Sequence, residues 1–380
     1  MKSKKDSTIV LHSGKENGNN FGAVTTPIFQ SSAYLYPYKD EALKYPRYGN
    51  LPNQQEVVDK ISALEHAEDG VLFSTGMGAI STVFLTLAKP GDHIIVQDQI
   101  YGGTTSFLEG LLKDFKVEVT YHDFCNNPDF TSCVKPNTKA LYIESPSNPL
   151  LKIVDIPVIA KLAKEKKIIS VIDNTFATPV NQKPILLGID VVVHSATKYL
   201  NGHSDLISGF VAGYSDLMKQ VRKNARDLGC TPNDLSAFFL ARGLKTLSIR
   251  MERHNSNAQK LAEFLENHKK VTKINYPGLK SHPQHKLAAG FMKGFGGMLS
   301  VEVDMDQKEL NEKLAKLNYF KRAVSLGGVE SLICLPCETS HSYLPKAERE
   351  KLGIKDSLIR VSVGIEDVED LINDWDEALA

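Results

Sequence analysis

The stretch KALYIES (139–145), followed by IPVIAKLAKEKK (156–167) and IISVIDN (168–174), decides the fold class. Two short apolar runs of strand length flank a segment whose apolar residues recur at helical spacing. A strand, an amphipathic helix and a second strand in this order form a βαβ unit, in which the two strands run parallel in one sheet. The sequence therefore predicts an α/β protein with a mainly parallel central sheet.

The same alternation continues on both sides of this unit. Upstream, NQQEVVDKISALEHA (53–67) predicts a helix, GVLFS (70–74) a strand and GAISTVFLTLAK (78–89) a second helix, and downstream DVVVHS (190–195) predicts another strand. After about residue 215 the pattern changes to a long helical stretch at 231–268, followed by mixed strands and helices. We expect an extended N-terminal arm over 1–50, a large ligand-binding domain over 51–245 and a smaller C-terminal α+β domain over 246–380.

Composition narrows the range of partners. The chain has 380 residues, and 45 lysines and arginines balance 45 aspartates and glutamates, so a nucleic-acid partner is not expected. No apolar run approaches the length of a membrane span, and the basic start lacks the apolar run of a signal peptide. The five cysteines are scattered along the chain, which indicates free thiols and a cytoplasmic protein. The spacing of Cys334 and Cys337 alone is weak support for a metal, and we expect no metal site.

Polar residues that suit an anion follow two of the predicted strands. Ligands of open α/β sheets bind beyond the carboxyl ends of the strands. STGMGA (74–79) lies between a strand and a helix, where backbone N–H groups and the helix N-terminus favour a phosphate. Ser195 and Thr197 add two hydroxyls after another strand. The motif matches neither the dinucleotide nor the P-loop pattern, which weakens a dehydrogenase reading, and a plain glycine-rich turn is the alternative.

Four further residues occupy informative positions. Lys198 follows a buried strand and, if partly desolvated, would act as a nucleophile toward an aldehyde, although a lone loop lysine is usually solvated. Asp173 ends a strand, where a carboxylate needs a cation such as a protonated pyridine nitrogen, or merely starts a turn. Tyr101 is placed to stack on a flat ring or to pack in the core. Arg360 lies within a strand and suits a carboxylate, or faces outward. Together they describe a site for a phosphorylated aromatic aldehyde and an amino acid.

Six motifs, in order along the chain, resemble one family. They are STGMGA (74–79), YIESPSNP (142–149), IDNTFATP (172–179), HSATKYLNGHSD (194–205), SLGGVESL (325–332) and LIRVSVGIED (358–367). They resemble the transsulfuration, or Cys/Met-metabolism, enzymes that use pyridoxal 5′-phosphate, and the resemblance runs from residue 25 to the C-terminus. It implies the aspartate-aminotransferase type of fold, fold type I, and a homotetramer built from active dimers.

The resemblance also implies a role for each matching residue. Lys198 would carry the cofactor covalently, Asp173 would pair with its pyridine nitrogen, and Tyr101 would stack on its ring and assist proton transfer. Tyr45 and Arg47 would reach the phosphate from the neighbouring subunit, with Tyr45 also assisting catalysis. The remaining cofactor ligands would be Gly76, Met77, Thr175, Ser195 and Thr197, and the substrate would meet Asn148, Ser325 and Arg360.

The activity that the resemblance implies is a carbon–sulfur lyase of sulfur amino acid metabolism. We expect elimination on cystathionine, γ-elimination being slightly preferred over β-elimination, to give a 2-oxo acid, ammonia and a thiol amino acid. The alternatives are γ-replacement, as in cystathionine γ-synthase or an O-acyl-homoserine sulfhydrylase, and methionine γ-lyase, which the cysteine-free YGGTT (101–105) weakens. A non-catalytic binding module is the alternative from another class. Val324, where γ-lyases often have glutamate, and LPCETSHS (335–342) depart from the family pattern.

Overall fold

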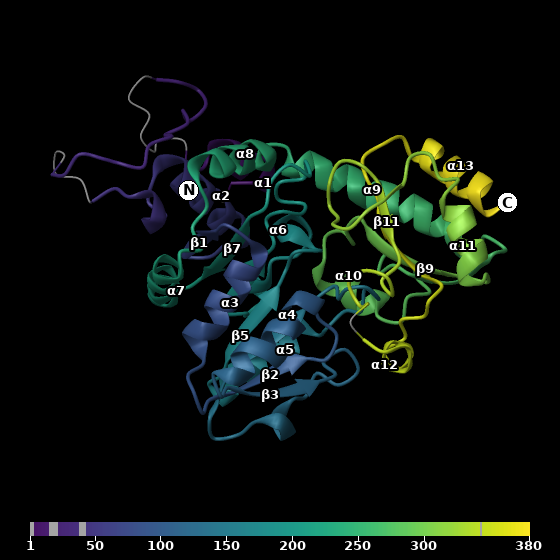
Figure 1. The fold of residues 1–380 in the computed structure, drawn as a ribbon, viewed down its shortest axis with the longest axis horizontal. Helices are drawn as coiled ribbons and strands as arrows, with labels where there is room; N and C mark the ends of the chain where they lie inside the picture. The colour runs from purple at the N-terminus through teal and green to yellow at the C-terminus, as the bar shows by residue number, and fades with distance from the viewer. Residues whose placement is uncertain (1–3, 15–21, 38–42, 343) are drawn as a thin grey trace.

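The structure is a computed structural model that describes residues 4–14, 22–37, 43–342 and 344–380. Figure 1 shows two sheets, each with its own helices, joined by the long helix α9 (Leu247–Glu266). The strands of the first sheet come from the N-terminal part of the chain, and those of the second sheet come from the C-terminal part. Within the described part of the chain, no helix has the length and apolar character needed to cross a membrane.

The first sheet has seven strands in the order β1-β7-β6-β5-β4-β2-β3. Only β7 runs antiparallel to its neighbours β1 and β6, and the other pairs are parallel. The predicted mainly parallel sheet is therefore confirmed. Its strands are β1 (Asp69–Phe73), β2 (His93–Gln97), β3 (Glu118–His122), β4 (Thr138–Glu144), β5 (Ile169–Asp173), β6 (Val191–His194) and β7 (Gly209–Gly213).

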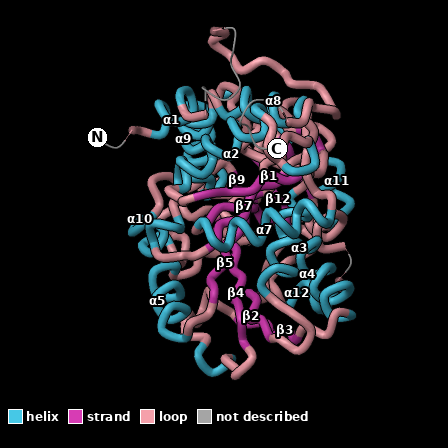
Figure 2. The backbone as a smooth tube through the Cα atoms, turned by 90° about the vertical axis from the view of Figure 1, so that its left-hand side faces the viewer, coloured by secondary structure: helices cyan, strands magenta, loops and turns pink. Residues whose placement is uncertain are grey.

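Helices cover both faces of this sheet, as Figure 2 shows for α5 on one side and α3 and α4 on the other. Successive residues of a strand point to opposite faces. In β6, Val191 and Val193 pack with one set of helices, whereas Val192 packs on the other face. The α-helices of this part are α2 (Pro52–Glu65), α3 (Gly76–Leu87), α4 (Gly102–Phe107), α5 (Ile156–Lys166), α6 (Thr178–Asn181), α7 (Ser215–Leu228) and α8 (Asp234–Leu244). The short 3₁₀ helices η1 (Pro46–Tyr48), η3 (Thr131–Cys133) and η4 (Pro184–Leu187) and the π-helical turn η2 (Leu108–Leu112) accompany them.

The second sheet has five strands in the order β10-β11-β12-β9-β8. Helix α9 links the two parts, because its Met251 packs in the core of the first and its Leu261 in the core of the second. The predicted boundary at residue 245 lies just before this helix and remains a prediction. The elements here are β8 (Val271–Asn275), β9 (Met298–Val303), β10 (Lys321–Arg322), β11 (Leu332–Cys334), β12 (Leu358–Ser362), α10 (His285–Phe291), α11 (Gln307–Leu314), α12 (Lys346–Lys351) and α13 (Val368–Leu379).

The N-terminal segment predicted as an arm contains a helix, α1 (Asp6–His12), that packs on α2 and α9. Lys60 holds its end, since Nζ donates to the carbonyls of Val10 (3.0 Å) and Ser13 (2.8 Å). Residues 22–37 follow without helix or strand, and Figure 1 shows this N-terminal part of the chain as loops that extend away from the body of the molecule. Residues 1–3, 15–21 and 38–42 of the predicted arm lie outside the described residues.

Candidate cofactor and substrate site

The predicted phosphate site lies where the N-terminus of α3 meets the end of β6. Thr75 caps α3, because its Oγ1 accepts from the Gly78 N–H (2.8 Å). A Cβ atom on Gly76 would lie 3.0 Å from the Ser195 side chain, and one on Gly209 would lie 2.2 Å from the Thr75 carbonyl oxygen. Close backbone approach therefore requires glycine at Gly209, and Gly76 leaves little room for a side chain beside Ser195. The amide groups at the start of a twelve-residue helix and the Ser195 hydroxyl thus lie together, as a phosphate needs.

A line of hydrogen bonds joins this corner to Asp173. The Ser195 N–H donates to Thr175 Oγ1 (2.8 Å), and the Thr175 N–H donates to Asp173 Oδ1 (2.9 Å). Thr197, by contrast, donates its hydroxyl to the Ser208 carbonyl oxygen (3.1 Å). Thr175 thus contacts both Ser195, predicted to bind the cofactor phosphate, and Asp173, predicted to bind the cofactor ring nitrogen. Thr197 could donate to the phosphate, as predicted, only by giving up its hydrogen bond to the Ser208 carbonyl.

Asp173 is buried at the carboxyl end of β5. The Tyr142 hydroxyl donates to its Oδ2 (3.4 Å), and Glu144 is its partner in register on β4. Burial raises the pKa of the Asp173 carboxyl. A carboxylate at such a position is stabilised by a nearby cation, so the residues fit the protonated pyridine nitrogen of pyridoxal phosphate.

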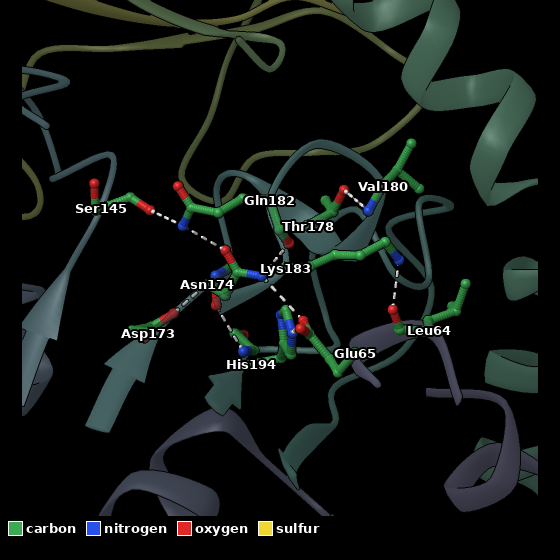
Figure 3. A network of polar contacts seen from close by, with 12 residues as sticks. Leu64, Glu65, Ser145, Asp173, Asn174, Thr178, Val180, Gln182, Lys183 and His194 are labelled. Carbon is green, nitrogen blue, oxygen red and sulfur yellow. Dashed lines mark hydrogen bonds and ion pairs between the residues drawn. The ribbon is translucent and has the colours of Figure 1, made fainter. Parts of the chain in front are cut away.

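A buried polar network lies beside Asp173 and includes His194, the residue before Ser195 (Figure 3). His194 Nε2 is 2.6 Å from Glu65 Oε1, and Asn174 Nδ2 donates to the same oxygen (2.9 Å). Gln182 Nε2 donates to Asn174 Oδ1 (2.9 Å) and to the Ser145 carbonyl (3.1 Å). The network ties the ends of β4, β5 and β6 to α2 and α6. It fixes the residues next to Asp173 and Ser195, and no local pattern in the sequence predicts it.

Lys198 lies beside Ser325 and Arg360, which come from distant parts of the chain. Its Nζ donates to Ser325 Oγ (2.7 Å), while Arg360 donates to the Ser325 carbonyl (3.0 Å) and to Asn148 Oδ1 (3.3 Å). Burial, together with the Arg360 guanidinium, lowers the pKa of the Lys198 amine from 10.5 to about 8. Ser325 adopts a φ of 84°, a conformation that is costly for a residue with a side chain. Because Lys198 is partly buried and hydrogen-bonded, the alternative of a solvated loop lysine is wrong. Because Arg360 is buried, the alternative of an outward-facing arginine is wrong as well.

Tyr101 and Met77 complete this region. A Cβ atom on Gly103 would lie 2.5 Å from the Tyr101 ring and 3.2 Å from Met77 Sδ, so the two side chains are neighbours. The Tyr101 N–H donates to Glu144 Oε2 (2.8 Å), while the residue itself is 44% exposed. The tyrosine is therefore anchored through its backbone, and a large part of its surface is free to cover a planar ring.

Tyr45 and Arg47 lie elsewhere in this chain. Arg47 donates to the Arg226 carbonyl (2.9 Å), near the end of α7, and its own carbonyl accepts from the Thr231 hydroxyl (2.9 Å). Its guanidinium also lies 5.7 Å from the centre of the Tyr45 ring. The structure thus does not bring this pair to Lys198 of the same chain, and their contact with a neighbouring subunit remains a prediction.

Comparisons with known proteins agree with this geometry. Residues 7–380 match the model of the family described as Cys/Met metabolism PLP-dependent enzyme. The chain is 46% identical to the cystathionine beta-lyase of Coxiella burnetii over 98% of this chain and 97% of that protein. It is 41% identical to the cystathionine gamma-lyase of Bacillus subtilis over 99% of each. The crystal structure of cystathionine gamma synthase from Xanthomonas oryzae pv. oryzae superposes with a TM-score of 0.95 at 37% identity, covering 99% of this chain and 98% of that one.

These matches span essentially the whole chain, and they confirm both the resemblance and the fold that it implied. The chain therefore belongs to the Cys/Met metabolism family of enzymes that depend on pyridoxal phosphate.

Proposed function

We propose that this protein is a carbon–sulfur lyase that acts on cystathionine. The observation that carries the proposal is the Lys198 amine, which is held 2.7 Å from Ser325 Oγ, has a pKa of about 8 and lies next to Arg360. Such an amine is poised both to bind an aldehyde and to move a proton near neutral pH. A non-catalytic binding module has no need for this arrangement.

The site residues divide the work between cofactor and substrate. Pyridoxal phosphate, when bound, supplies an electron sink for the electrons released at the substrate Cα. Gly76, Met77 and Ser195 would hold its phosphate, and Asp173 would keep its pyridine nitrogen protonated. Tyr101 would cover the ring.

Arg360 and Asn148 would hold the substrate carboxylate. The Arg360 guanidinium has five N–H donors, and the two hydrogen bonds to Ser325 and Asn148 fix its plane while leaving donors for a bidentate contact. Lys198, once free, would take the proton from Cα, because Ser325 holds its Nζ on the same side as Arg360.

The first reaction to test is γ-elimination, which requires a second proton to leave Cβ. Lys198 and Tyr101 would serve as the groups that reach both carbons. A second candidate, β-elimination, is favoured by Val324, which is 68% exposed and offers no carboxylate to a distal amine, and by the similarity to the Coxiella burnetii β-lyase.

A product assay separates these reactions. Cystathionine is supplied to the cofactor-loaded protein, with Lys198→Ala as the control. Release of 2-oxobutanoate with cysteine supports γ-elimination, and release of pyruvate with homocysteine supports β-elimination. A new thioether formed from an activated homoserine and cysteine would indicate replacement instead, and the release of neither 2-oxobutanoate nor pyruvate from cystathionine would refute the lyase proposal. The homotetramer and the cytoplasmic location remain predictions.

A further inference from the structure

Glu144 is a buried carboxylate that the proposed chemistry does not use. It ends β4, is 4% exposed and lies in register with Asp173 on the neighbouring strand. Two carboxylates at adjacent strand ends repel each other, and taking both out of water adds to the cost. A residue kept at such a position needs a compensating contact.

The contacts of Glu144 are two backbone N–H groups from separate segments. Its Oε2 accepts from the Tyr101 N–H (2.8 Å), at the start of α4, and its Oε1 accepts from the Asn148 N–H (2.9 Å), in the loop after β4. Its own N–H donates to Gln97 Oε1 (2.9 Å), which ties the backbone of Glu144 to the end of β2. One side chain thus holds two segments that carry site residues.

We propose that Glu144 is a positioning residue that holds the Tyr101 ring and the Asn148 amide at the cofactor and substrate through its two carboxylate oxygens. This inference rests on the proposed function, because it takes Tyr101 to cover the cofactor ring and Asn148 to hold the substrate with Arg360. Only a carboxylate offers an acceptor to each of the two N–H groups. A glutamine has the same shape, but its NH₂ group would face one N–H and leave that donor unpaired.

The matched control is Asp374 on α13. It is also 4% exposed, and its two oxygens accept from the backbone N–H groups of Asn318 (2.8 Å) and Tyr319 (2.9 Å). Asp374→Asn therefore makes the same chemical change as Glu144→Gln in the core of the C-terminal part of the chain. Differences between the two variants report on the site rather than on the loss of a buried carboxylate.

The test measures cofactor affinity by titrating the cofactor-free protein with pyridoxal phosphate in equilibrium dialysis. We expect Glu144→Gln to raise the dissociation constant about 10- to 100-fold, because the Tyr101 or Asn148 N–H group loses its acceptor and is left unpaired. KM for the substrate should rise as well, through Asn148. Asp374→Asn should leave both quantities within about twofold of the wild type while lowering the melting temperature.

Equal cofactor affinities in Glu144→Gln, Asp374→Asn and the wild type would overturn the inference. If Glu144→Gln does not fold, Glu144→Asp, which keeps both acceptor oxygens on a shorter side chain, decides by the same comparison with Asp374→Asn. A wild-type protein that binds the cofactor but releases no keto acid from cystathionine refutes the proposed function and leaves the dialysis result for Glu144 to stand on its own.

Discussion

The Lys198 amine of the cofactor-free protein should react with acylating reagents in a pH range well below that of an ordinary lysine. Burial is the larger cause and the Arg360 charge the second, and together they lower its pKa from 10.5 to about 8. At pH 7 the neutral, reactive fraction of such an amine is then about 300-fold larger than at the ordinary value. Because burial also slows access of the reagent to the amine, the midpoint of the pH profile measures the lowered pKa better than the reaction rate at a single pH does.

The sign of the effect on stability follows from the same numbers. Between pH 8 and 10.5 the unfolded chain binds the lysine proton and the folded chain does not, so the contribution of Lys198 to stability becomes less unfavourable as pH rises through this window. Below pH 8 the folded protein bears the full cost of the buried charge. The cofactor-free protein should therefore gain stability at pH 7 when Lys198 is replaced by methionine.

Pulse labelling with acetic anhydride between pH 6 and 11, followed by mass spectrometry of the peptides, measures the midpoint directly. Lys161, whose side chain is 77% exposed, serves as the internal reference. The Lys198 midpoint should fall near pH 8, and Arg360→Met should move it upward, because one of the two causes is removed. A Lys198 profile that coincides with that of Lys161 would refute the reasoning about burial and charge.

Three further outcomes are expected. Asp173→Asn should lower kcat at least about 100-fold, measured as keto acid release, because the amide no longer keeps the pyridine nitrogen protonated; unchanged turnover would contradict that role. Ser325→Ala should lower kcat about five- to tenfold with cofactor affinity in dialysis unchanged, since it removes one hydrogen bond from Lys198 Nζ; a loss of cofactor instead would place Ser325 in the cofactor site. Mixing inactive Arg47→Ala and Lys198→Ala proteins should restore part of the activity in hybrid dimers, and no recovery would indicate that the arm serves its own subunit.

The site residues that lie at strand ends could be predicted because a parallel sheet brings its strand ends to one edge. Asp173, Ser195 and Lys198 needed only the order of apolar runs to be placed together. Arg360 was harder, because strand periodicity leaves open which face a single residue occupies. The pairing of β12 between β11 and β9 decides it, and the side chain is buried against Ser325 and Asn148.

Other features depend on contacts between residues far apart in the sequence. Glu65 and His194 are 129 positions apart, and nothing in either local stretch indicates that they pair. Glu144 gives a weak signal, a carboxylate at the end of the apolar run LYIE (141–144), but its partners are backbone N–H groups and have no side-chain signature. Helix α1 is only seven residues long and is stabilised by packing on α2 and α9 rather than by propensity, so no periodicity predicts it.

The positions of these groups suggest how one site serves different reactions in this family. Asp173, Glu144 and Arg360 are buried, and each would act on a group that does not differ from one amino-acid substrate to another: the cofactor nitrogen, the backbone of the ring-covering Tyr101, or the substrate carboxylate. Val324, directly before Ser325, is exposed instead. A substitution there alters what the distal end of the substrate meets without leaving a buried charge unpaired, and so costs little stability. We therefore expect substrate choice to change at the exposed position while the buried groups proposed for the shared first step stay fixed.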